Sequence, residues 1–174
     1  MNGVRVCAQS TLTEACAADA VIIGSGIKTR ELVQDAALLS RITLDPKRQL
    51  IGAQCSGTLM LAKLGLVGDL PACTDLTTKP WVIEAGVRVL DQPFVAHGNV
   101  ASAGGCLSSQ YLAGWLIARG ASLEEMQAAL HYVAPVGEKD VYVTRAMAVI
   151  TQYLPQTDQR IAARRIPCPP VSTR

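Results

Sequence analysis

A cysteine beside two small residues, at the end of an apolar run, is the side chain best suited to covalent chemistry in this sequence. Residues 52–57 read GAQCSG and join an expected buried strand, 49–54, to an expected helix, 56–64. A strand that turns sharply into a helix projects the residue at its apex, and a glycine just after it lets the two elements pack closely. Cys55 would then lie at a helix N-terminus, which stabilises a thiolate and lowers its pKa.

We therefore predict that Cys55 is a nucleophile and that the backbone N–H of Ser56 points toward the charge created by its attack. The alternative is a buried structural cysteine, which is the commoner role of this residue.

A second glycine turn, Gly24-Ser25-Gly26, follows the expected strand 20–23. This turn is either a simple loop between a strand and a helix, or it supplies a second backbone donor, the N–H of Gly26, that faces Cys55. The dinucleotide fingerprint GxGxxG fails because residue 29 is Thr, so we predict neither a nicotinamide cofactor nor any other.

Alternating apolar strands and amphipathic helices must position these turns. Strands are expected at 4–8, 20–23, 49–54, 87–90, 94–97 and 100–103. Helices are expected at 29–42, 56–64 and 140–153. A further helix should follow Gly104-Gly105, with an apolar face from Leu107 to Leu116, and another should begin at a capping box at 122–125. A polar loop should occupy 71–81, and Gly98-Asn99 should form a hairpin turn.

This order of elements favours an α/β fold, a flavodoxin-like three-layer sandwich with a mostly parallel sheet. Sites in such sheets form at the carboxyl ends of the strands, where both glycine turns fall. We expect one domain over residues 1–154 and a loose, basic, proline-rich tail over 155–174.

The composition excludes several function classes. The chain has 174 residues, 49% hydrophobic and 17% charged, with a net charge of +2, which suits one globular domain and disfavours nucleic-acid binding. No apolar run is long enough to span a membrane, and no secretory signal is visible, so we expect a cytoplasmic protein. Six scattered cysteines and two histidines predict neither a disulfide framework nor a structural metal site.

Several motifs together resemble the ThiJ/PfpI superfamily, the glutamine-amidotransferase-like α/β proteins. They are the paired turns at 21–26 and 52–57, the segment 72–75 (ACTD) beside the family's Ala-Thr-Thr-His, and 98–104 (GNVASAG) beside its Gly-Asn-x-x-Thr-Ser-Ala-Gly. The similarity covers roughly residues 3–154. It implies a nucleophilic Cys55, with Gly24, Ser25 and Thr74 as supporting residues.

The chain departs from the family pattern in its polar residues. Ser56 replaces the histidine that often follows the cysteine, as in the isonitrile hydratase branch and the amidase-like domains of AraC-type regulators. Asp75 stands where the family often has histidine, and with Ser56 it is a candidate to position water. His97 would supply the missing imidazole only if the fold brought it near Cys55; otherwise it is a solvated histidine at a strand end.

The resemblance also implies a strand, a helix and a strand before the segment matching 4–8, with a carboxylate that contacts the cysteine; no residue here matches that carboxylate. Without these elements a neighbouring strand edge should be exposed, covered by a partner or repacked, unless the chain is a truncated product. Family members are usually homodimers, so we expect a homodimer here.

We therefore predict a cysteine-dependent hydratase or hydrolase that acts on a small electrophilic substrate and resembles isonitrile hydratase. The alternatives are a non-enzymatic sensing or ligand-binding domain, related to the amidase-like half of AraC-type regulators, and a redox-sensing thiol protein.

Overall fold

A mixed four-stranded sheet forms the framework of the computed structural model, which describes residues 4–155. Its strands are β1 (Ala20–Ile23), β2 (Leu50–Gln54), β3 (Phe94–His97) and β4 (Val100–Ala103). The strand order is β1-β2-β4-β3, with β1, β2 and β4 parallel and β3 antiparallel to β4. The predicted α/β class and mostly parallel sheet are confirmed, and so is the hairpin between β3 and β4, where Gly98 has a φ of 60°.

Helices alternate with these strands and then continue beyond them. They are α1 (Leu12–Ala17), α2 (Thr29–Leu32), α3 (Ala36–Leu39), α4 (Gly57–Lys63), α5 (Lys79–Glu84), α6 (Ser109–Gly120), α7 (Leu123–Val133) and α8 (Lys139–Ile150), with 3₁₀ turns at Cys106–Ser108 and Thr151–Tyr153. The expected helices near 56–64, 123 and 140–153 are confirmed. Within the described residues, no helix has the length and hydropathy needed to cross a membrane.

Four local predictions are wrong. Residues 4–8 form no strand and lie exposed, because a strand persists only within a ladder and this segment joins none in the sheet. The predicted helix 29–42 is two short helices, since the side chain of Asp35 accepts a hydrogen bond from the N–H of Leu38 (2.9 Å) and starts α3 anew. Residues 87–90 make only one isolated bridge, Ala72 with Val89, and the polar loop 71–81 already contains the start of α5.

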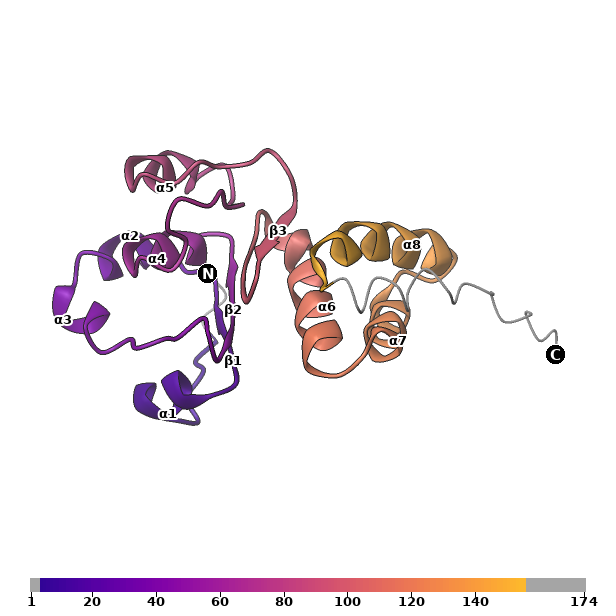
Figure 1. Cartoon of the computed structure of the whole chain (residues 1–174), viewed down its shortest axis with the longest axis horizontal. Helices are drawn as coiled ribbons and strands as arrows, with labels where there is room; N and C mark the ends of the chain where they lie inside the picture. The colour runs from indigo at the N-terminus through magenta and orange to yellow at the C-terminus, as the bar shows by residue number, and fades with distance from the viewer. Residues whose placement is uncertain (1–3, 156–174) are drawn as a thin grey trace. The chain divides into compact units, whose positions relative to one another are not determined.

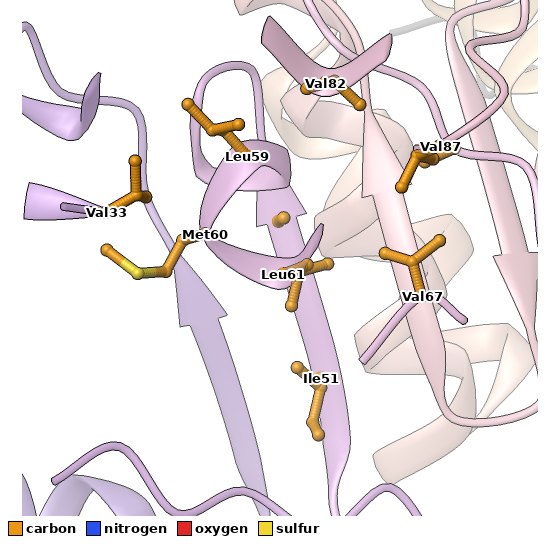
Figure 2. Close-up of a cluster of buried hydrophobic side chains, with 10 residues drawn as sticks. Val33, Ile51, Leu59, Met60, Leu61, Val67, Val82 and Val87 are labelled. Atoms are coloured by element: carbon orange, nitrogen blue, oxygen red, sulfur yellow. The ribbon is translucent and has the colours of Figure 1, made fainter. Parts of the chain in front are cut away.

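The hydrophobic core of the sheet lies between its strands and the helices on one side of it. Figure 1 shows α2, α4 and α5 on the same side of β1 and β2. Figure 2 shows the side chains that fill this layer, with Leu59, Met60 and Leu61 of α4 placed between Ile51 of β2 and Val82 of α5. The wholly apolar face of α4 explains why the sequence predicted this helix correctly.

The chain divides into two compact units, Met1–Leu112 and Ala113–Arg174, and the boundary falls inside α6. The division into one domain and a tail stays a prediction, and residues 156–174 of that tail lie outside the described residues. In the second unit Gly114 permits close packing, because a Cβ there would lie 2.6 Å from the Cδ1 of Ile150. Leu107, expected on the buried face, is exposed because it belongs to the 3₁₀ turn before α6.

Candidate active site

Cys55 occupies the apex of a strained turn between β2 and α4. Its φ is 49°, and among the described residues it is the only non-glycine residue with a positive φ. The backbone is held on both sides: the N–H of Cys55 donates to the carbonyl of Ala103 (2.8 Å), and its carbonyl accepts from the Oγ1 of Thr74 (2.8 Å). An L-residue in this conformation costs on the order of 1 kcal/mol or more, so the fold imposes the elbow on the cysteine.

Two glycines allow the neighbouring backbone to come close enough to build this elbow. A Cβ on Gly57 would lie 2.2 Å from the carbonyl oxygen of Ile23, and one on Gly104 would lie 2.5 Å from that of Thr74. Glycine is therefore required at both positions, the first beside β1 and the second beside the loop that follows residue 72.

The sulfur of Cys55 is buried and faces hydrogen-bond donors. The residue is 3% exposed, the Nε2 of Gln54 lies 3.2 Å from Sγ, and the backbone N–H of Gly105 also bonds to the sulfur. The pKa of Cys55 is raised, chiefly by burial; the bonds from Gln54 and Gly105 oppose the rise, and the charges of Cys106 and Asp75 add to it. The predicted lowering of this pKa is wrong, because desolvation outweighs whatever a seven-residue helix contributes at its N-terminus.

The hydroxyl of Ser56 connects the elbow at Cys55 to the glycine turn at 24–26 through hydrogen bonds. Its Oγ accepts from the N–H of Gly26 (3.0 Å) and lies within hydrogen-bond distance of the hydroxyls of Ser25 (3.2 Å) and Thr29 (3.1 Å). The N–H of Gly26 is thus committed to Ser56, which corrects the prediction that it faces Cys55. The Ser56 side chain is buried and fully engaged, so it positions the turn at 24–26 rather than a water.

Asp75 follows Thr74, whose hydroxyl bonds to the Cys55 carbonyl, and its charge contributes to the raised pKa of Cys55. Its Oδ1 accepts from the N–H groups of Thr77 and Thr78 (3.0 Å each), while its Oδ2 is buried with no hydrogen-bond partner. The fold therefore brings together Cys55, Thr74 and Asp75, three residues that the sequence singled out. An unpartnered carboxylate oxygen is an unusual feature that a ligand or a water would satisfy.

His97 lies at the opposite end of the sheet. It pairs with Val100, and Val100 pairs with Ile51, whereas Cys55 follows the last pair, Gln54 with Ala103. Cys55 lies four positions after Ile51, which corresponds to about 13 Å along a strand. His97 instead lines a separate cavity of about 40 Å³, so its proposed role as the imidazole partner of Cys55 is wrong.

Three residues at the sulfur were missed by the sequence reasoning. Gln54 and Gly105 supply its hydrogen bonds, and Cys106 supplies a second thiol. The pair Gly104-Gly105 after an expected strand was the available signal, since consecutive glycines often mark a close backbone approach. Within residues 4–155, no group of three His, Cys, Asp or Glu side chains forms a metal site.

Chemically, the site offers a mostly protonated thiol, two N–H donors directed at its sulfur, and a nearby carboxylate with one free oxygen. The backbone N–H of Ser56 has no acceptor among the described residues and completes the set of donors. This set can support addition of sulfur to a small electrophile, with backbone amides available to a developing negative charge.

Comparison with known proteins identifies the fold. No protein-family model matches the sequence, and no curated protein does. Solved structures match: a variant of a DJ-1 superfamily protein from Salmonella typhimurium has 26% identity and a TM-score of 0.60, covering 76% of this chain and 74% of that one. Drosophila melanogaster DJ-1β has 18% identity with the same TM-score and coverage.

A two-domain protein from Anabaena variabilis, with DJ-1/ThiJ/PfpI-like and ferritin-like domains, matches with 20% identity and a TM-score of 0.57. The match covers 66% of this chain, which spans only 34% of the Anabaena protein. These structural neighbours show that the chain has the flavodoxin-like α/β fold of the DJ-1/ThiJ/PfpI superfamily.

Proposed function

We propose that this chain is a cysteine-dependent hydratase or hydrolase that acts on a small electrophilic carbon, with isonitriles as the substrate class. The observation that carries the proposal is the strained backbone of Cys55, whose φ of 49° holds a sulfur that receives hydrogen bonds from Gln54 and Gly105. Strain of this kind persists where the surrounding structure enforces it, and it concentrates at functional sites.

The burial of the sulfur favours a slender substrate. With Cys55 only 3% exposed, a terminal N≡C group, which is linear and one atom wide, suits the approach better than a branched acyl group. The Cys-Ser pair at 55–56, which resembles the isonitrile hydratase branch, supports the same substrate class.

The raised pKa of Cys55 sets the order of proton transfer. The thiol is protonated at neutral pH, so its S–H adds across the terminal carbon: sulfur bonds to the carbon, and the proton moves to the same carbon, giving a thioimidate. Water adds to that carbon, and expulsion of the Cys55 sulfur releases the formamide and restores the thiol. Overall, one isonitrile and one water give one formamide.

In this proposal the attacking water bonds to the unpartnered Oδ2 of Asp75, and the backbone N–H of Ser56 donates to the charge that develops on the substrate. Ser56 acts through its backbone alone, because its hydroxyl is held by the turn at 24–26.

The test is conversion of an alkyl isonitrile to its formamide, followed by chromatography. We expect turnover by the unaltered chain, complete loss in Cys55→Ala, and no change in Cys7→Ser, which alters an exposed cysteine in the segment before β1. Equal rates for the unaltered chain and Cys55→Ala would refute nucleophilic catalysis at this thiol.

A non-enzymatic ligand-binding domain is the second candidate. The observation that favours it is the position of His97, since the histidine proposed as the partner of Cys55 lies at the other end of the sheet. In that case an isonitrile would bind with equal affinity to the unaltered chain and to Cys55→Ala, and neither would release formamide.

A further inference from the structure

Cys106 is an exposed thiol beside a buried one, and neither the fold nor the proposed hydration reaction requires it. It opens the 3₁₀ turn Cys106–Ser108, directly after the glycine pair that follows β4. We propose that Cys55 and Cys106 form a reversible disulfide under peroxide, in which Cys106 is oxidised first and Cys55 resolves it.

The hydrogen bonds of Gln54 hold the segment that carries Cys106 against the sulfur of Cys55. Its Nε2 donates both to the carbonyl of Gly105 (2.6 Å) and to the Sγ of Cys55 (3.2 Å), so one amide group links the residue before Cys106 to that sulfur. Two residues before Gly105, the carbonyl of Ala103 accepts from the N–H of Cys55 (2.8 Å). These hydrogen bonds fix Ala103 and Gly105 beside Cys55, and Cys106 is the next residue along the chain.

The backbone at Gly105 supplies the freedom that a disulfide needs. Its φ of 84° is one that glycine adopts readily, and a Cβ at this residue would meet no heavy atom within 4 Å. This freedom lets the 3₁₀ turn move toward the Cα separation of about 4.4–6.8 Å that disulfides require. The mutual charge effect between the two thiols, which contributes to the raised pKa of Cys55, agrees with their proximity.

Exposure sets the order of events, because peroxide reaches the exposed Cys106 far more readily than the 3%-exposed Cys55. In the first step the Cys106 sulfur attacks one oxygen of hydrogen peroxide, the O–O bond breaks, and a sulfenic acid and one water form. In the second step the Cys55 sulfur attacks the sulfenic sulfur, and the hydroxyl group leaves with the Cys55 proton as a second water. Two thiols and one peroxide thus give one disulfide and two waters.

The remaining cysteines do not offer an equivalent pair within the described residues. Cys73 is fully buried, so peroxide does not reach it as it reaches the exposed Cys106. Cys16 is buried near the carbonyl of Arg41 (3.9 Å), and Cys7 is exposed before α1.

The disulfide would occupy the sulfur on which the proposed hydration depends, so reduction would switch the activity on and peroxide would switch it off. This regulatory consequence rests on the proposed function, whereas the disulfide itself does not.

Tryptic mapping tests the bond directly, because residues 49–63 and 89–119 form separate tryptic peptides that each carry one cysteine of the pair. After treatment of the full chain with one equivalent of peroxide, we expect these peptides to be linked, and to separate on reduction. Cys106→Ser should abolish the link, and Cys7→Ser should leave it intact. In Cys55→Ala, Cys106 should accumulate as a sulfenic acid that dimedone traps.

Sulfinic acid on Cys55 without a linked peptide, or a link that survives Cys106→Ser, would overturn the proposal. A linked peptide in a chain that makes no formamide would support the disulfide and count against the hydratase. Formamide production that peroxide leaves undiminished while the peptides are linked would refute the regulatory consequence.

Discussion

The strain of the elbow falls on a single residue, Cys55, whose backbone would suit glycine better than any L-residue. The structure holds it there through the Ala103 carbonyl and the Thr74 hydroxyl, so the conformational preference of cysteine does not explain its presence at this position. Because the proposed catalysis needs a thiol where the backbone favours glycine, substitutions at residue 55 separate the two demands.

We expect Cys55→Gly to be more stable than Cys55→Ala by about 1 kcal/mol, because alanine keeps the penalty of a positive φ and glycine does not. Urea unfolding of the two variants measures the difference. The matched control is Ala53→Gly in the adjoining strand, where φ is negative and glycine should destabilise the chain. A Cys55→Ala variant as stable as Cys55→Gly would show that the turn relaxes in solution.

The sequence predicted the apex cysteine correctly but not the environment that sets its pKa. Cys55 and Gly57 lie within one short motif, so local turn chemistry predicts them. Gln54 lies in the same motif, but Gly105 reaches the sulfur from the turn after β4, and its approach depends on strand register that a single sequence does not specify. Burial of the thiol is a property of the whole environment, and it reversed the expected direction of the pKa.

At the scale of elements, the end of β1 and the start of α4 pack closely together, and this contact positions the site. The carbonyl of Ile23 lies where any side chain at residue 57 would project, so this contact brings the turn at 24–26 within reach of Ser56.

Gly57→Ala should destabilise the chain by about 1–3 kcal/mol through overpacking, because the carbonyl it meets belongs to the backbone and cannot rotate away. Thermal and urea unfolding measure the loss. Gly24→Ala is the matched control: a Cβ there meets nothing within 4 Å and φ is not positive, so its stability should hardly change. Similar stabilities for the two variants would argue against the tight β1–α4 contact.

Helices and strands were predicted correctly where the hydrophobic periodicity agreed with the burial. The prediction failed where a strand depends on pairing with a neighbouring strand. The apolar residues of α4 face a core on several sides, and the capping serine of α7 does accept from the N–H of Glu125, so both helices followed from the sequence. Residues 4–8 have the composition of a strand, but a strand forms only when it pairs with a neighbour. In the described structure this segment pairs with no strand, and β1 is the edge of the sheet.

For the molecule as a whole, the buried thiols link stability to alkaline pH. Burial raises the pKa of Cys73 from 9.0 to about 12, and it also raises that of Cys55. A thiol whose pKa is raised by folding stabilises the folded state fully below the unfolded pKa, and that contribution is lost as the pH rises from about 9 toward about 12.

We therefore expect the free energy of unfolding to fall steadily above about pH 9, as measured by urea unfolding between about pH 8 and about pH 10. The Cys73→Ala variant should be less stable near neutrality because it leaves a cavity, but its alkaline decline should be shallower. An identical alkaline slope in the variant would assign the effect to other groups.

Self-association is expected at the exposed edge of the sheet. Ile22 of β1 is 52% exposed and Ile27 beyond it is more exposed still, and edge strands offer unpaired backbone groups to a second copy. Ile22→Lys should shift sedimentation toward the monomer while circular dichroism stays unchanged. A monomeric mass for the unaltered chain at high concentration would contradict the predicted homodimer.

For the whole molecule, the sequence predicted the class of fold because strand and helix signals alternate along it. A small set of connection rules then leaves few possible strand orders. The division into units at residue 112 was not visible, since it falls within a continuous helix that carries no composition change.

The amide of Gln54 has a fixed orientation, and this makes it a natural spectroscopic reporter. Because its nitrogen is anchored to the Gly105 carbonyl, rotation would set two oxygens against each other, so the sulfur always meets an N–H group. Alkylation, ionisation or bridging of that sulfur must then shift the side-chain amide resonance of this glutamine. A single nitrogen-15 signal would follow the state of the thiol without any attached label.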